Sequence, residues 1–260
     1  MIRYSFPLIA NSIAWWVNNA SDRYILTLIC GVAVNGVYSV AYKVPTILTT
    51  FQSIFYNAWS ISAIAEFDDK DRDGFIGNNY SLYSFVSIIV CAGLILINIP
   101  VAKLLYSGEF FEAWKCVPFL LVGTVFNGIS QFEGSLFAAV KHTKSVAITT
   151  VLGAVLNTIC NLIFIQCWGS IGAALATMLG YCLTWILRTA FLKNFVCMKV
   201  NWINHFIAIL LIIGEAVLAT LNILYVVQIS FVLIIIVLHK NYIKPILNIV
   251  FSKFKHVKHG

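Results

Sequence analysis

The side chains that could do chemistry are few and lie within long apolar stretches. Arg23 and Lys43 are cations in stretches that are otherwise almost uncharged, and Asp22 is the adjacent acid. Basic side chains bind phosphate oxygens through charge-assisted hydrogen bonds, so two such cations suit an anionic group such as a pyrophosphate. The alternative is structural: Asp22 neutralises Arg23, and Lys43 extends its ammonium group outward to water.

Polar and aromatic residues recur at helical spacing in the same two stretches. One helix face carries Asn11, Trp15, Asn18 and Asp22. The next stretch carries a stripe of Tyr38, Tyr42, Pro45, Thr49, Gln52 and Tyr56, and beside it a second stripe of Ser39, Lys43, Thr46, Thr50, Ser53 and Asn57. These faces predict a cavity that accepts something polar and bulky. For any single residue, the alternative is a polar contact that joins two helices.

Two further acids, Glu133 and Glu215, also lie within apolar stretches. Each is a candidate protonatable group, and each could equally be a boundary residue that reaches the headgroups. We assign ion coupling to Glu133 as a hypothesis.

One loop resembles a metal site. Asp69, Asp71 and Asp73, followed by Gly74, match the first half of a calcium-binding EF-hand loop. Tyr80 stands where that loop needs a bidentate Glu, so a solvated loop is the better interpretation. Hydrolase, metalloprotease and nucleotide-binding motifs are also missing from the sequence. We therefore expect no catalytic residue, no metal, no cofactor and no enzymatic activity.

The composition defines the class of protein. Of the 260 residues, 60% are hydrophobic and 10% are charged, with a mean hydropathy of +0.90. Soluble globular proteins have about 25% charged residues, so the chain has too little polar surface to be soluble. The remaining class is a polytopic membrane protein, which also excludes a nucleic acid as partner.

The elements that position these residues are membrane-spanning helices. A bilayer core about 30 Å thick requires about 20 helical residues to cross it. Eight stretches have about this length, and we predict an all-α bundle that forms a single transmembrane domain over residues 1–260. The predicted spans are 7–29, 36–64, 81–106, 117–139, 145–167, 170–191, 203–220 and 222–238.

The distribution of charge predicts the orientation of the chain. With eight spans, 13 of the 17 Lys and Arg residues, Arg188 among them, fall on the side of the two termini, and three fall opposite. Basic residues favour the cytoplasmic side, so both termini are predicted to be cytoplasmic. Arg23 and Lys43 then share one depth, about 9 to 10 Å from the opposite surface.

A set of short motifs runs through about the first 195 residues. These are PLIAN (7–11), the turn Asp22-Arg23-Tyr24, GVYSVAYKVP (36–45), Trp59, KHTK (141–144) and GAVLNTICN (153–161), which leads to WGSIGAALAT (168–177). In these motifs the sequence resembles the polysaccharide flippases of the multidrug/oligosaccharidyl-lipid/polysaccharide exporter superfamily, of the O-antigen and capsule type.

The resemblance implies a fold and a function. In that family two helix bundles face each other around a cavity that opens alternately to the two sides of the membrane. The chain would be the C-terminal bundle, in the inner membrane of a bacterium, and would flip undecaprenyl-pyrophosphate-linked oligosaccharides for surface polysaccharide biosynthesis. Arg23 and Lys43 would help to hold the pyrophosphate. One bundle cannot alternate access by itself, so a separate N-terminal half or a second copy is an expected partner, beside membrane lipid.

Three other functions stay open. A small-molecule exporter of the same superfamily would favour acids in the cavity, and Arg23 and Lys43 argue against it. A membrane-embedded glycosyltransferase or polymerase would need an acidic or histidine cluster in a large loop outside the bilayer, and the longest such loop is 67–80. The third is an inactive, truncated half.

Overall fold

The computed structural model describes residues 2–240, except for the side chains of residues 2–8, 10, 15 and 17–19. Within this part, the secondary structure consists of helices without strands. The prediction of an all-α helix bundle is therefore confirmed. The predicted side of the C-terminus concerns residues outside the described part.

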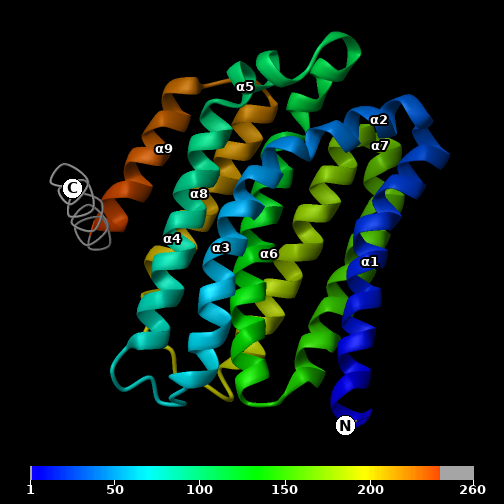
Figure 1. Cartoon of the computed structure of the whole chain (residues 1–260). Helices are drawn as coiled ribbons and strands as arrows, with labels where there is room; N and C mark the ends of the chain where they lie inside the picture. The colour runs from blue at the N-terminus through cyan, green and yellow to red at the C-terminus, as the bar shows by residue number, and fades with distance from the viewer. Residues whose placement is uncertain (1, 241–260) are drawn as a thin grey trace, which may run out of the picture.

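The helices follow one another with short connections. In chain order they are α1 (Ile2–Cys30), α2 (Val32–Ala41), α3 (Lys43–Ala65), α4 (Phe75–Leu96), α5 (Asn98–Leu105), the 3-10 helix η1 (Gly108–Lys115), α6 (Val117–Ala139), α7 (Thr143–Leu192), α8 (Trp202–Thr220) and α9 (Tyr225–Leu238). The long helices run side by side (Figure 1). The N-terminus and the α3–α4 and α6–α7 turns lie at one end of the bundle, here called the N-terminal end, whereas α2 and α5 lie at the other, the α2 end.

Several helices are suited to a bilayer. In the described chain, α4, α7 and α8 are long and apolar enough to cross a membrane, and η1 with α6 passes the same test as a pair bent by 52°. α1 and α3 have 29 and 23 residues, but their polar faces lower their hydropathy. The chain is thus a multi-pass membrane protein. The number of eight spans and the sides of the termini stay predictions.

α7 is a helical hairpin with two legs. Its 50 residues include Gly169, whose φ of 55° and ψ of −128° are not helical. The chain reverses there, so that Thr184 donates a hydrogen bond to the carbonyl oxygen of Thr149 on the other leg. The break falls between the predicted spans 145–167 and 170–191.

Two predicted spans begin or bend differently in the structure. The predicted span 36–64 is divided into α2 and α3, after Gly31 turns the chain with a φ of 87°. The next predicted span, 81–106, is also divided, and its first helix begins at Phe75. This earlier start has a local cause in the preceding loop.

Asp71 caps α4 from that loop. The side chain is 1% exposed and accepts hydrogen bonds from the backbone N–H groups of Ile76 and Gly77, at 2.9 Å each, and of Lys199, at 3.1 Å. Capping of this kind satisfies N–H groups that a helix start leaves without partners. Asp71 therefore both starts α4 and fixes the α7–α8 connection. In the same loop, hydrogen bonds from the backbone and guanidinium of Arg72 lower the pKa of Asp68 to about 2.

The core is centred on α6 and its aromatic neighbours. Trp59 of α3 stacks on Phe132 of α6, with ring centroids 4.0 Å apart and planes 9° apart. Tyr83 of α4 also stacks on Phe132, with ring centroids 5.5 Å apart. These contacts hold α3, α4 and α6 as one unit, against which the hairpin α7 and helix α1 are placed.

Candidate functional site

Asp22 is buried at the junction of α1, α2 and both legs of α7. It is 1% exposed, and its carboxylate accepts hydrogen bonds from Tyr38 at 3.1 Å, Thr177 at 2.6 Å and Asn161 at 2.5 Å. Asn161 also donates to Asn157, 3.1 Å away. We call these five residues the Asp22 network. A buried carboxylate without a cation requires such donors, because burial of an unpaired charge is costly.

Three members of this network were not predicted as site residues. Asn157, Asn161 and Thr177 entered the sequence analysis only through the motifs they belong to. A signal was present: two Asn residues at i and i+4 in an apolar stretch share one helix face and must find polar partners in lipid. What the sequence cannot give is the partner, since Asp22 lies 139 residues before Asn161.

Arg23 turns away from its neighbour Asp22. The side chain is exposed, and its guanidinium carbon lies 5.8 Å from the ring centroid of Tyr42. Lys43 is exposed as well and follows Tyr42 in the chain. Arg23 thus lies near the residue that directly precedes Lys43. The ion pairs among the described residues are Arg72–Asp68 and Lys115–Glu112, so Asp22 does not neutralise Arg23 directly.

The two stripes predicted for α2 and α3 have different surroundings. From the first stripe, Tyr38, Pro45 and Gln52 are buried. Gln52 fills the space beside Gly128 of α6, where an added Cβ would lie 2.4 Å from its Nε2 atom. The second stripe contains the exposed polar face of α3: Lys43, Thr46, Thr50, Ser53 and Asn57.

The hydroxyls of this exposed face donate within their own helix. Thr46 donates to the carbonyl oxygen of Tyr42, and Thr50 to that of Thr46, at 2.8 Å each. Their oxygen lone pairs remain free to accept hydrogen bonds from outside. Lys43 and Asn57 supply donors at the two ends of this face.

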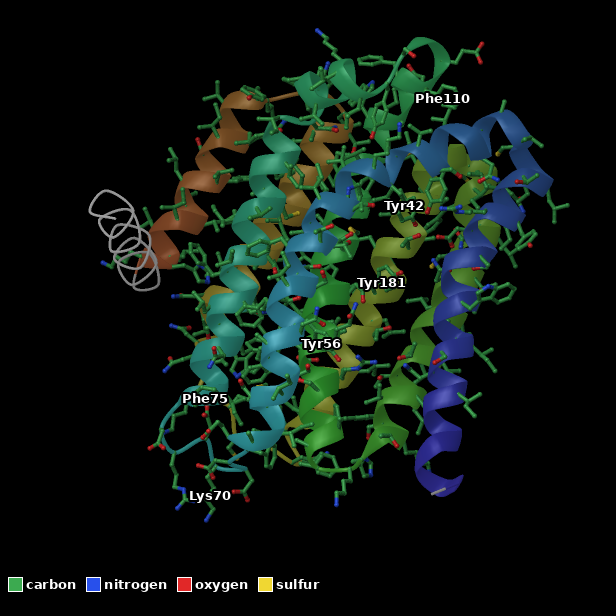
Figure 2. The ribbon with its side chains drawn as sticks, in the orientation of Figure 1. Tyr42, Tyr56, Lys70, Phe75, Phe110 and Tyr181 are labelled. Carbon is green, nitrogen blue, oxygen red and sulfur yellow. The ribbon has the colours of Figure 1, made fainter. Side chains whose placement is uncertain are left out.

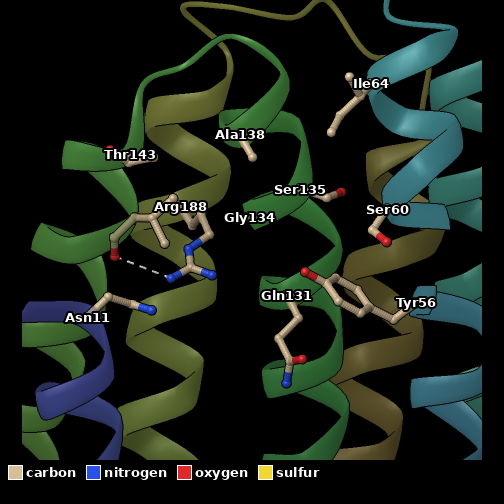
Figure 3. A pocket seen from close by; sticks show the side chains of 11 residues that line it. Asn11, Tyr56, Ser60, Ile64, Gln131, Gly134, Ser135, Ala138, Thr143 and Arg188 are labelled. Carbon is tan, nitrogen blue, oxygen red and sulfur yellow. Dashed lines mark hydrogen bonds between the residues drawn. The ribbon is translucent and has the colours of Figure 1, made fainter. Parts of the chain in front are cut away.

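A polar cavity of about 440 Å³ opens between α1, α3, α6 and α7. Figure 3 shows Arg188 on one side of it and Tyr56, whose hydroxyl points into the cavity, on the other. The lining residues are Asn11, Tyr56, Ser60, Ile64, Gln131, Gly134, Ser135, Ala138, Thr143, Val146 and Arg188. We call this space the Arg188 cavity. Its volume is in the range of small-ligand sites.

Arg188 is buried in this wall, 2% exposed. Its guanidinium donates to the carbonyl oxygen of Ser130 at 2.6 Å and to the hydroxyls of Thr150 at 2.8 Å and Thr149 at 3.3 Å. Arg188 was counted among the basic residues on the side of the termini, and in the structure its side chain is enclosed by the bundle rather than exposed there. Its side chain lies on the face of α7 that also carries Thr177, Gly180 and Thr184.

Asn11 is joined to the same group. The hydroxyl of Thr150, which accepts from Arg188, donates to the Oδ1 atom of Asn11 at 2.7 Å. Arg188, Thr150 and Asn11 thus link α7 to α1. The side chains of the other predicted residues of the α1 face, Trp15 and Asn18, lie outside the described part of the structure.

Glu133 is fully buried, at 0% exposed, and directly precedes Gly134 of the cavity wall. Its Oε1 atom accepts hydrogen bonds from Thr189 at 2.6 Å and from Tyr80 at 3.5 Å. Its Oε2 atom has no hydrogen-bond partner. Glu133 is thus an interior carboxylate rather than a boundary residue.

Fold and site together define a class: a polytopic membrane helix bundle with polar groups inside it and on one outer face. Residues 36–215 match the family described as "Polysaccharide biosynthesis protein". Because this match covers more than half of the chain, the chain belongs to that family. The resemblance to polysaccharide flippases of the exporter superfamily is confirmed.

Known relatives and solved structures agree with this family. The chain is 23% identical over 209 residues to the "Probable low-salt glycan biosynthesis flippase Agl15" of Haloferax volcanii, which covers 78% of the chain and 43% of that protein. It superposes on the lipid II flippase MurJ in an inward closed conformation with a TM-score of 0.62 and 16% identity, over 95% of the chain and 55% of MurJ. It superposes on a MOP superfamily transporter from Pyrococcus furiosus with a TM-score of 0.60 and 18% identity, over 88% of the chain and 52% of that transporter. The chain spans about half the length of these proteins.

Proposed function

We propose that the chain forms the C-terminal bundle of a transporter that flips lipid-linked glycans across a membrane by alternating access. The observation that carries this proposal is the exposed polar face of α3, which runs from Lys43 to Asn57 on an otherwise apolar protein. Lipid does not tolerate such a face, so it requires a polar cavity beside it. Membership of a polysaccharide biosynthesis family supports glycans as the cargo.

The proposed substrate is an undecaprenyl-pyrophosphate-linked oligosaccharide, flipped across the inner membrane of a bacterium. Arg23, which lies near the ring of Tyr42, and Lys43, the next residue after Tyr42, would attract the pyrophosphate. Sugars would lie along the exposed polar face of α3. The lipid tail would stay in the bilayer, and no covalent step is required.

A complete cavity requires a second bundle. The relatives are about twice as long as the region they share with this chain. We propose that either a separate N-terminal half or a second copy of the chain supplies the facing wall. That wall would lie across the cavity from the exposed polar face of α3.

Complementation tests this function. The chain would be expressed in a flippase-deficient strain, alone and together with the N-terminal half of a related flippase, and surface polysaccharide would be measured. Restoration in either case supports flipping, and the two cases distinguish self-association from a split transporter. No restoration, with the protein shown to be inserted in the membrane, would overturn the proposal.

Charge variants refine the test. Arg23→Gln and Lys43→Gln should each lower the restored polysaccharide by about tenfold or more, because each removes a charge-assisted hydrogen bond. Lys103→Gln is the matched control, since Lys103 is an exposed cation on α5 at the same end of the bundle. An equal loss with Lys103→Gln would argue against a specific role for Arg23 and Lys43.

A further inference from the structure

The charge of Arg188 is not balanced by a paired acid. All of its hydrogen-bond acceptors are neutral oxygens, from Ser130, Thr149, Thr150 and Val146. In the described part of the chain, no carboxylate lies within ion-pair distance of the guanidinium. Glu133, a residue of the neighbouring helix α6, is instead bonded by Thr189 and Tyr80.

A buried cation without an ion pair usually has a functional reason. Desolvation of a charge is costly, and in membrane proteins such residues face a cavity and bind a ligand or a partner group. Arg188 faces the Arg188 cavity, in which its nitrogen atoms lie opposite the hydroxyl of Tyr56 (Figure 3). Glu133 interacts with this guanidinium electrostatically but makes no ion-pair contact with it, so an anion in the cavity could still bind Arg188 directly.

The rest of the lining suits a group that bears hydroxyls or ester oxygens. Asn11, Ser60 and Gln131 add amide and hydroxyl groups from three different helices. A cation on one wall and neutral hydrogen-bonding groups on the other walls are the pattern expected for a phosphate with a polar substituent.

The cavity is separate from the Arg23 and Lys43 pair. Tyr42 lies near the α2 end of the bundle, and Tyr56 lies farther toward the N-terminal end (Figure 2). These two residues are 14 positions apart on nearly continuous helix, which corresponds to about 20 Å. The exposed residues Thr46, Thr50 and Ser53 lie between them.

We propose that the Arg188 cavity is an anion site that binds the phosphate of a lipid headgroup at the N-terminal end, as a first station before the Arg23 and Lys43 pair. Arg188 provides the cation, while Tyr56 and Gln131 bind the polar substituent. The anion site is inferred from the geometry of the cavity and Arg188, whereas its role in binding the transported lipid rests on the proposed function. The shared chemistry is a phosphate ester, from a prenyl diphosphate or from a bulk anionic lipid.

A binding experiment tests the site. The whole chain would be reconstituted in phosphatidylcholine nanodiscs, and the Kd for farnesyl diphosphate would be measured. Arg188→Gln should raise this Kd by about tenfold or more, because it removes the charge from the hydrogen bonds. Lys103→Gln, which changes an exposed cation of α5 outside both the cavity and the Arg23 and Lys43 pair, is the matched control and should retain the affinity.

A second variant covers the case in which Arg188→Gln does not fold. Ala138→Leu adds apolar volume to the cavity and removes no side-chain hydrogen bond, so it should also weaken binding. Unchanged affinity in Ala138→Leu and in a folded Arg188→Gln would overturn the anion site. Size-exclusion chromatography and thermal unfolding report whether each variant is folded.

Two additional arms separate the sources of the phosphate. Inorganic pyrophosphate tests the anion without a lipid, and nanodiscs with phosphatidylglycerol test a bulk lipid as competitor. If phosphatidylglycerol competes and this competition depends on Arg188, the anion site is supported with a bulk lipid as its ligand. If phosphatidylglycerol does not compete, a prenyl diphosphate is supported as the ligand. Binding that depends on Arg188, combined with failed complementation, would retain the site and overturn the proposed function.

Discussion

Thr177, on the second leg of α7, donates a 2.6 Å hydrogen bond to Asp22 of α1, 155 residues earlier in the chain. The same carboxylate accepts from Tyr38 of α2 and from Asn161 on the first leg. One acid therefore joins three helices inside an apolar bundle. The Asp22 network fixes how the hairpin α7 is seated against α1, and it explains why Asp22 is not available to pair with Arg23.

Thr177→Val tests this joint. The substitution keeps the shape of the side chain but removes one donor from a buried carboxylate, so it should destabilise the protein by about 1 to 2 kcal/mol. Thr158→Val is the matched control on the same helix, because Thr158 donates only to the carbonyl oxygen of Ala154. Thermal unfolding in detergent measures both. Equal stability of the two variants would contradict the role of Thr177.

Much of the fold follows from the hydropathy of single segments. α6 begins and ends at the residues predicted for it, and the break at Gly169 falls between two predicted spans. The beginning of α4 was missed because it depends on a cap from Asp71, and Asp71 is held by Lys199, 128 residues later. A window of consecutive residues carries no information on such a contact.

The site was less predictable than the fold. The spacing of Asn11 and Asp22 placed both residues correctly on an inward face of α1, and the stripe of α3 contained its exposed polar face. The cavity with Arg188 was missed, because a basic residue near the end of a span has the same sequence signal whether it faces water or a cavity. Only the packing of α6 against both legs of α7 distinguishes the two cases.

Gly153→Ala should disturb the close contact of the two α7 legs. An added Cβ would lie 2.0 Å from the hydroxyl oxygen of Thr184 and 2.7 Å from the carbonyl oxygen of Gly180. Overpacking of this kind costs about 1 to 3 kcal/mol. Gly93→Ala in α4 is the control, since nothing lies within 4 Å of its added Cβ, and helix propensity should stabilise it by up to about 1 kcal/mol. Opposite changes in thermal stability are expected, and a shift of the same sign would argue against close packing.

Asp71→Ala should loosen the N-terminal end of the bundle. It leaves three backbone N–H groups without their acceptor and should cost about 2 kcal/mol, with faster proteolysis of residues 193–201. Asp73→Ala is the control, because Asp73 is exposed in the same loop. If both variants are cleaved at the wild-type rate, Asp71 does not fix the α7–α8 connection.

Glu133→Gln tests the hypothesis that Glu133 couples transport to an ion. A Gln side chain still accepts the hydrogen bond from Thr189, and its amide nitrogen replaces an oxygen that has no partner, so stability should change by only about 1 kcal/mol. It cannot bind or release a proton. In vesicles that contain the complete transporter, glycan flipping by Glu133→Gln should therefore no longer respond to a pH gradient. Glu215→Gln is the control, because Glu215 is an equally buried carboxylate in α8. If the pH response is lost in Glu215→Gln and retained in Glu133→Gln, the coupling residue is Glu215 of α8 rather than Glu133 of α6.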